Sequence, residues 1–115
     1  MKTINLLENV SFKETSPNSE ALFADENNRI LLFSFKPHQV LEKHNSPKSP
    51  VVITVLKGKG VFTGGDGKEE ILEPNSLIVF SVAENHSVKA LDEELIFMAI
   101  LNGVIKTHDP VGTMA

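Results

Sequence analysis

The side chains in this sequence that are best suited to ligand binding or proton transfer are its four histidines. They are His38, His44, His86 and His108, in a chain of 115 residues that has no cysteine and no tyrosine. Neutral imidazole binds zinc, iron, copper and nickel, and it also forms hydrogen bonds with small molecules. Without cysteine, the chain has no disulfide, no thiolate zinc site and no cysteine nucleophile. Any site therefore depends on which histidines the fold brings together.

The segment around His44 offers one further group. If a strand continues from Val40 through His44, the alternation of side chains puts Glu42 on the same face as His44. The same alternation places His38 on that face, although a histidine that follows a proline at a turn is more often exposed. His108 lies in a polar C-terminal tail, where a solvated residue is the ordinary interpretation. Glu42 is therefore the best candidate for a group that acts together with His44.

The elements that must position these residues are predicted to be short strands. Apolar runs rich in Val, Ile, Leu and Phe are cut at nearly regular intervals by Gly, Pro, Asn and Asp, which is typical of an antiparallel sandwich or barrel. The nine predicted strands are 21–24, 29–36, 40–43, 51–56, 60–63, 69–72, 77–81, 86–91 and 94–101. This pattern leaves little room for helices. We therefore predict an all-β, single-domain protein with a barrel core at about 29–101, an N-terminal arm at 1–20 and a C-terminal tail at 106–115.

Composition and charge limit the classes of partner. The formal net charge is −4 and no cluster of Lys and Arg forms a basic surface, so we expect no nucleic-acid partner. No apolar run approaches the length of a membrane span or a signal peptide, so we expect no membrane partner and a cytoplasmic location. The strands 51–56 and 95–101 are apolar on both alternating faces, which predicts a second packed layer. A homodimer would supply that layer.

Two segments resemble the two conserved motifs of the cupin superfamily. The first is the segment 41–60, LEKHNSPKSPVVITVLKGKG, in which a loop with His44 leads into a strand that ends in a turn glycine. The second is the segment 72–91, LEPNSLIVFSVAENHSVKAL, in which a turn, a strand and His86 follow in that order. The resemblance covers about residues 30–101 and implies a small RmlC-like jelly-roll barrel, a double-stranded β-helix. It also implies that His44 and His86 lie at the mouth of the barrel.

The metal-binding form of the first cupin motif has two histidines and a carboxylate, and the second motif adds another histidine. Counted back from the turn glycine, the carboxylate position is Val51, and the two histidine positions are Pro47 and Asn45. His44 matches the first histidine with one residue of slippage, and His86 matches the histidine of the second motif. The metal-ligand motif is therefore degraded. The resemblance implies at most a weakly held divalent ion, Fe, Mn, Ni or Zn, at His44 and His86.

The leading hypothesis for function is a small-molecule-binding cupin of unknown specificity, with His44, His86 and Glu42 in the ligand pocket. The alternative is a metal-dependent cupin enzyme of the oxygenase or isomerase class, in which His44 and His86 hold the ion and Glu42 is a candidate third ligand. A metal-free epimerase with a histidine base is a weaker hypothesis. It needs a second acid, and without tyrosine only Lys43 or Lys89 could serve.

Overall fold

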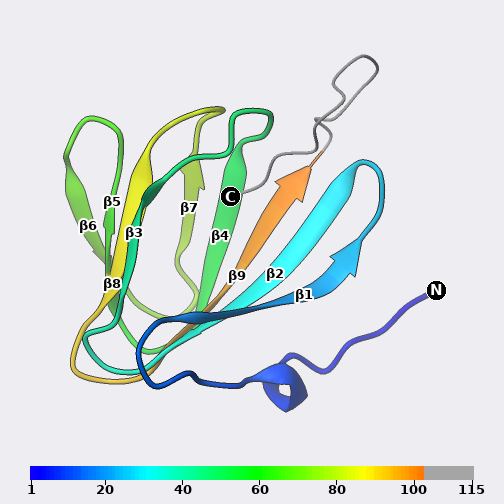
Figure 1. The fold of residues 1–115 in the computed structure, drawn as a ribbon, viewed down its shortest axis with the longest axis horizontal. Coiled ribbons are helices and arrows are strands. Elements are labelled where there is room, and N and C mark those ends of the chain that lie inside the picture. The colour runs from blue at the N-terminus through cyan, green and yellow to red at the C-terminus, as the bar shows by residue number, and fades with distance from the viewer. Residues whose placement is uncertain (103–115) are drawn as a thin grey trace.

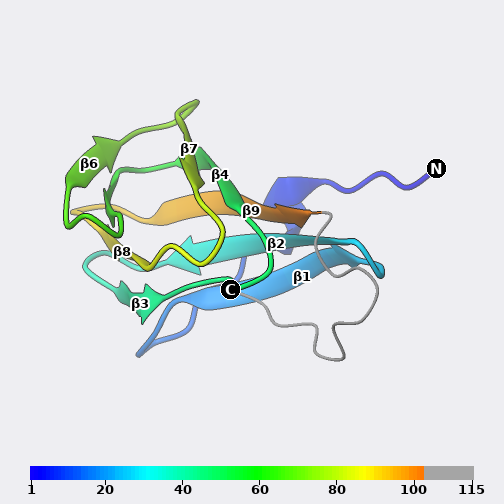
Figure 2. The same cartoon turned by 90° about the horizontal axis from the view of Figure 1, so that it is seen from above.

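The computed structural model describes residues 1–102, in which nine strands form two antiparallel sheets that face each other (Figures 1 and 2). The strands are β1 (Asn18–Ala24), β2 (Asn28–Phe35), β3 (Val40–His44), β4 (Val51–Lys57), β5 (Gly60–Thr63), β6 (Glu69–Leu72), β7 (Leu77–Phe80), β8 (His86–Ala90) and β9 (Leu95–Asn102). One sheet has five strands in the order β1-β2-β9-β4-β7, and the other has four in the order β3-β8-β5-β6. The core lies between them.

The predicted all-β fold is confirmed, and each predicted strand is found within a few residues of its predicted bounds. β1 begins at Asn18 rather than at residue 21, so the five-stranded sheet includes residues assigned above to the N-terminal arm. The arm also forms a single 3-10 turn, η1 (Leu6–Asn9), which was not predicted and which the Asn5 side chain caps. Within residues 1–102, no helix is long and apolar enough to cross a membrane. The predicted tail, 106–115, lies outside the described residues.

The core is built from the alternate residues of β2, β4 and β9 that point between the sheets. The register brings Phe33 of β2 beside Phe97 of β9, and their rings stack with centroids 4.9 Å apart. Phe62, from the opposite sheet, meets Phe97 edge-on with centroids 5.6 Å apart, which packs the two sheets together. Burying a side chain of this size contributes roughly 1.5–3 kcal/mol, so these rings are a main source of stability.

The outer face of the five-stranded sheet is apolar as well. Val52 of β4 and Ile100 of β9 are partners on this face, and both are half-buried. On the edge strand β7, Leu77 and Val79 are exposed to 61% and 54%, so this edge offers apolar surface to solvent. β4 and β9 therefore do present apolar residues to both faces, as their sequences predicted.

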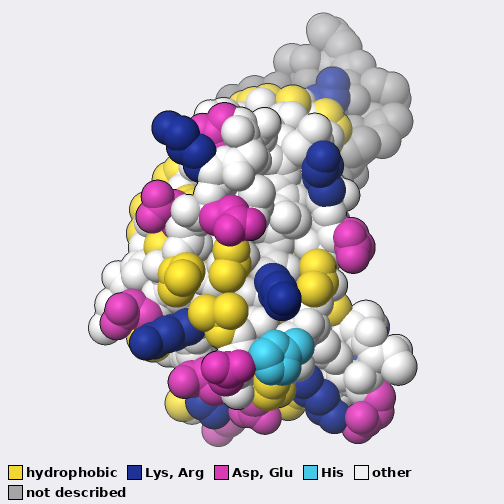
Figure 3. Space-filling view, turned by 90° about the vertical axis from the view of Figure 1, so that its left-hand side faces the viewer, with side chains coloured by type: hydrophobic (Ala, Val, Ile, Leu, Met, Phe, Trp, Pro, Cys, Tyr) yellow, Lys and Arg dark blue, Asp and Glu magenta, His cyan; other side chains and the backbone are white. Residues whose placement is uncertain are grey.

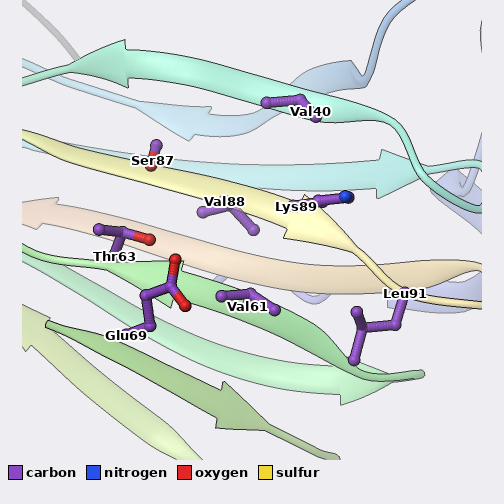
Figure 4. Close-up of a pocket in the computed structure, with 8 residues that line it drawn as sticks. All are labelled: Val40, Val61, Thr63, Glu69, Ser87, Val88, Lys89 and Leu91. Carbon is purple, nitrogen blue, oxygen red and sulfur yellow. The ribbon is translucent and has the colours of Figure 1, made fainter. Parts of the chain in front are cut away.

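The outer face of the four-stranded sheet carries a groove of about 370 Å³ (Figures 3 and 4). Figure 3 shows hydrophobic side chains gathered on this face among acidic and basic ones. The groove is lined by Val40, Val61, Thr63, Glu69, Ser87, Val88, Lys89 and Leu91 (Figure 4). The groove includes none of the residues predicted for the ligand pocket, His44, His86 and Glu42, although Lys89, a candidate acid of the epimerase hypothesis, lines it.

Candidate functional site

His44 and His86 face each other at one end of the barrel. His44 is the last residue of β3 and His86 is the first residue of β8, and the two are partners across this antiparallel pair. Their ring centroids are 4.3 Å apart, with an angle of 60° between the ring planes. The two histidines singled out in the sequence therefore share one site.

The backbone holds both imidazoles in the same way. Nδ1 of His44 lies 2.9 Å from the carbonyl oxygen of Glu42, and Nδ1 of His86 lies 3.0 Å from the carbonyl oxygen of Glu84. A carbonyl oxygen only accepts hydrogen bonds, so each Nδ1 carries the proton and donates it. In the neutral form of each ring, Nε2 then has a lone pair, and no described residue is hydrogen-bonded to either Nε2. The site presents two neighbouring hydrogen-bond acceptors.

The surroundings of His86 keep its ring neutral. The ring stacks on Phe80, with centroids 4.4 Å apart and planes 7° apart, and the residue is only 3% exposed. Burial lowers the pKa of His86 below its ordinary value of 6.5, the hydrogen bond to the Glu84 carbonyl opposes this effect, and the nearby His44 lowers the pKa again. At neutral pH, His86 is therefore an uncharged acceptor.

Glu42 does not share the face of His44. The pairing of β3 with β8 shifts between Leu41, which is opposite Val88, and His44, which is opposite His86. β3 therefore has one more residue than β8 between these pairs, which is a β-bulge. Because of the bulge, Leu41 and His44 both line the interior, whereas Glu42 is exposed. The expectation that alternation places Glu42 beside His44 is wrong.

The other two histidines do not join this site. His38 lies in the turn before β3, at the end of the strand opposite to His44, with a left-handed φ of 68°. Its Nε2 is 3.3 Å from a carboxylate oxygen of Asp92, and the side chain is 61% exposed. The expectation that His38 shares the face of His44 is therefore wrong, because the turn directs its ring outward. His108 lies outside the described residues.

The interior behind the two imidazoles is closely packed. Side chains from both sheets leave a cavity of about 10 Å³, which is room for about one water molecule. Apart from the imidazoles, its walls are apolar, and they are formed by Phe33, Leu41, Val51, Ile53, Val88, Phe97 and Ala99. A ligand larger than water therefore meets the imidazoles from the mouth of the barrel.

The described residues do not complete a set of metal ligands around the two histidines. Residues 1–102 contain no group of three or more His, Cys, Asp or Glu side chains that could hold an ion. Val51, at the position predicted for the carboxylate, lies in the cavity wall and is 2% exposed. A divalent ion here would have two imidazole nitrogens and otherwise water, a donor set suited to weak binding. These residues therefore fit a tightly held metal poorly, and we assign no chemical step to one.

The loop that follows His44 is fixed to its surroundings at three points. The hydrogen bonds run from Asn45 Nδ2 to Asn85 Oδ1 (2.8 Å), from Ala83 N to Ser46 O (2.9 Å) and from Asn102 N to Ser49 Oγ (3.0 Å). The first of them joins the residue after His44 to the residue before His86. The mouth therefore has a defined shape before any ligand binds, which lowers the ordering cost of binding.

Glu84 joins the mouth to the neighbouring hairpin. Its carboxylate accepts hydrogen bonds from the backbone N of Gly65 (2.9 Å), in the β5–β6 turn, and from that of Ser81 (2.8 Å). These two bonds lower the pKa of Glu84 below its ordinary value. The carbonyl of the same residue accepts from His86, so Glu84 is placed to position that ring through its backbone.

Arg29, which was not among the predicted site residues, lies in the same row across the five-stranded sheet as Val51, a residue of the cavity wall beside the imidazoles. It is the only arginine in the chain, and it lies at the start of β2 on the face that Leu31 and Phe33 bury in the core. Its Nε is buried and has no hydrogen-bond partner among the described residues. The signal in the sequence was a charged residue at an inward-facing position of a mostly apolar strand, where such residues are rare.

The fold and the site define a small double-stranded β-helix barrel with histidines at its mouth. The family model described as "Cupin domain" matches residues 31–101. The chain therefore belongs to the cupin family, which confirms the resemblance of its two motifs. Among curated proteins, none matches this chain.

Several solved structures share this fold over most of the chain. An RmlC-like cupin protein from Desulfovibrio desulfuricans is 29% identical, with a TM-score of 0.77, over 88% of this chain and 96% of that chain. A Cupin 2 conserved barrel domain protein from Leptotrichia buccalis is 30% identical, with a TM-score of 0.77, over 86% of this chain and 47% of that chain. An uncharacterized conserved protein with a double-stranded β-helix domain from Klebsiella pneumoniae has a TM-score of 0.84 over 90% of this chain and 91% of that chain. At 16% identity, it shows the fold alone.

Proposed function

We propose that this cupin binds a small molecule at the mouth of its barrel, with His44 and His86 as the polar anchors. The observation that carries the proposal is the shared geometry of the two imidazoles, each of which donates from Nδ1 to a backbone carbonyl and presents the lone pair of Nε2. A ligand that donates an O–H or N–H group to each Nε2 satisfies both rings. The ligand class is therefore a small molecule with hydroxyl or amine donors.

The shape of the mouth supports binding there rather than deep in the barrel. The cavity behind the rings holds about 10 Å³, so a ligand lies across the opening, with the imidazoles beneath it. The other residues that line the cavity behind the rings are apolar, so the two imidazoles are the polar groups that a ligand at the mouth can contact there. The loop that follows His44 is already fixed, so binding orders few side chains.

The test is a fragment screen followed by affinity measurements on variants. His44→Ala and His86→Ala each remove one acceptor, and the loss of one such hydrogen bond weakens binding roughly fivefold to tenfold. His38→Ala is the matched control, because His38 is exposed and pairs with Asp92 away from the mouth. Equal affinities for wild type and both site variants would contradict the proposal.

A metal-dependent cupin enzyme, of the oxygenase or isomerase class, is the second candidate. The observation that favours it is the orientation of the rings, since histidine ligands commonly donate from one ring nitrogen to a carbonyl and bind metal through the other. The measurement is elemental analysis of protein purified without a His tag or chelator and then titrated with iron, manganese, nickel and zinc. With two ligands from the described residues, we expect less than one ion per chain. One ion per chain, lost in His44→Ala, would favour the enzyme.

We also propose that the protein is a homodimer and that the outer face of the five-stranded sheet forms the interface. The apolar residues of β4, β7 and β9 on that face support this assembly. The cytoplasmic location expected from the sequence stays a prediction.

A further inference from the structure

We propose that Arg29 is the anion-binding residue of the barrel mouth, so that the ligand of this cupin is a small organic acid whose carboxylate pairs with the guanidinium. This inference rests on the proposed function, because it names the class of molecule that the mouth receives. Arg29 is not part of the cavity wall around the imidazoles, and it lies outside the two cupin motifs at 41–60 and 72–91.

The register of the five-stranded sheet places Arg29 on the inner face at the mouth. Arg29 of β2 is opposite Leu101 of β9, Leu101 is opposite Val51 of β4, and Val51 is opposite Phe80 of β7. Leu101, Val51 and Phe80 are all buried in the core, so this row of residues faces the interior. Arg29 belongs to the same row, and its side chain leaves the sheet on the same side.

The same row connects Arg29 to the imidazoles. Val51 lines the cavity together with His44 and His86, and Phe80 stacks on the ring of His86. Arg29 is two strands from Val51, which is a backbone separation of roughly 10 Å. The long arginine side chain shortens this distance, so one small molecule could contact the guanidinium at one end and the imidazoles at the other.

Among residues 1–102, no hydrogen bond or ion pair to the guanidinium of Arg29 explains its position. Its Nε is buried without a hydrogen bond, and none of the ion pairs among residues 1–102 involves it. A buried donor without a partner is costly, and native proteins keep few of them. Arginine is always charged, and its planar guanidinium donates two parallel hydrogen bonds to the two oxygens of a carboxylate. A carboxylate supplied by the ligand would satisfy this group.

The three groups together describe the ligand. The guanidinium requires an oxyanion, whereas the two Nε2 atoms, which accept hydrogen bonds, require O–H or N–H groups. A hydroxy acid or an amino acid of a few carbon atoms carries both. A neutral polyol provides only the donors, and a simple fatty acid provides only the carboxylate, so we expect each to bind more weakly.

The chain allows a direct measurement, because its single arginine gives a single Nε–H signal in the spectrum of 15N-labelled protein. The probes are glycolate, acetate, inorganic phosphate and ethylene glycol, titrated at constant ionic strength with chloride as the balancing salt. We expect glycolate to shift the Arg29 signal with saturation and to bind more tightly than acetate, and we expect ethylene glycol to leave it unchanged. A shift that is linear in concentration for every acid would overturn the proposal, as would saturation by phosphate alone.

Variants separate recognition from a structural role. Arg29→Met removes the charge and should weaken glycolate binding at least about tenfold. Arg29→Lys keeps the charge but not the planar, bidentate guanidinium, so its loss of affinity should be smaller. Lys59→Met is the control, since Lys59 is exposed in the turn between β4 and β5, at the other end of the barrel, and the same loss of charge there should leave the affinity unchanged.

If Arg29 is retained for the ligand, Arg29→Met should unfold at the same or a higher denaturant concentration than wild type. A less stable variant with unchanged glycolate affinity would overturn the proposal, and if Arg29→Met does not fold, Arg29→Lys decides.

The ring signals of the histidines, followed in the same titrations, distinguish this inference from the function on which it rests. If ethylene glycol or other neutral donors shift the His44 and His86 signals while no acid shifts Arg29, the mouth binds ligands and the anion site is refuted. If glycolate saturates the Arg29 signal without moving either imidazole, the anion site stands and the histidine anchors are refuted.

Discussion

His86 is the residue whose burial has the clearest consequence for stability. Its pKa is lowered in the folded protein, so the unfolded chain binds this proton more readily than the native chain does. The stabilising effect of the neutral ring is complete above the ordinary value of 6.5 and is lost as the pH falls through the lower value of the folded state. We therefore expect the free energy of unfolding to decrease as the pH is lowered from about 7.5 to about 5.

Urea unfolding across this pH range measures the effect. His86→Phe keeps an aromatic ring against Phe80 but cannot be protonated, so its stability should depend less on pH than that of wild type. His38→Ala, which alters an exposed histidine, should keep the dependence of wild type. An unchanged slope in His86→Phe would show that the proton is taken up elsewhere.

Residue by residue, the sequence predicted the histidine pair better than its surroundings. The two motifs placed His44 and His86 at the mouth because each follows or precedes a strand with a clear apolar pattern. Glu42 was assigned wrongly because a β-bulge changes the alternation of side chains, and no feature of the segment 40–44 signals the extra residue. Arg29 was missed because a strand that starts with a charged residue resembles the polar end of a turn.

The turn from β4 to β5 depends strongly on a single glycine. Gly58 has a left-handed φ of +76°, and a Cβ at this position would lie 1.9 Å from the backbone oxygen of Glu94. Gly58→Ala should therefore lower the free energy of unfolding by roughly 2–5 kcal/mol, because the clash adds to the strain of the left-handed backbone. Gly67 also has a left-handed φ, +81°, but nothing lies within 4 Å of its Cβ position.

Gly67→Ala is consequently the matched control for Gly58→Ala. It introduces the backbone strain alone and should cost about 1–2 kcal/mol. Chemical denaturation of both variants measures the difference. Equal losses would mean that the contact with Glu94 relaxes without cost and that the β4–β5 turn is more adaptable than its geometry indicates.

Glu84 connects two elements, the loop before β8 and the β5–β6 hairpin. Glu84→Gln keeps the size of the side chain but replaces the carboxylate, whose two oxygens accept hydrogen bonds from the backbone N–H groups of Gly65 and Ser81. Hydrogen bonds to a charged acceptor are stronger, so we expect a modest decrease in melting temperature at neutral pH. The pKa of Glu84 is lowered in the folded protein, which gives the sign of the pH dependence. The stabilisation by the charged carboxylate is present above the ordinary pKa of 4.5 and is lost as the pH falls through the lower pKa of the folded state. The melting temperatures of wild type and variant should therefore converge in acid. A difference that persists there would assign the effect to packing.

The strands were predictable because their residues alternate between a buried and an outer face. The register of β4 against β9, with Ile53 opposite Ala99 and Val55 opposite Phe97, follows from keeping the apolar set in the core. The 3-10 turn at Leu6–Asn9 was not predictable in this way, because it buries none of its residues and is formed by the local cap from Asn5.

At the scale of the whole molecule, the described part of the chain forms a barrel with a packed core and with the two imidazoles at one end. The phenylalanine rings of both sheets occupy the space that a larger ligand would need, and the remaining cavity is about 10 Å³. Sequence patterns identify which residues face inward, but they do not give the volume left between them. The two imidazoles of the site, His44 and His86, therefore lie at the mouth, which is where we propose that Arg29 binds the same ligand.

The outer face of the five-stranded sheet leads to the last prediction, the oligomeric state. Exposed apolar side chains on the edge strand β7 continue the half-buried row formed by Val52 and Ile100, and a second copy of the sheet would cover both. Light scattering at micromolar concentration should give twice the chain mass of 12.6 kDa. Val79→Lys places a charge in this interface and should yield the monomer, whereas Ile71→Lys, which alters a residue 65% exposed on the other sheet, should leave the dimer intact. A monomeric wild type would refute the assembly, and a dimer broken by Ile71→Lys instead would place the interface on the four-stranded sheet.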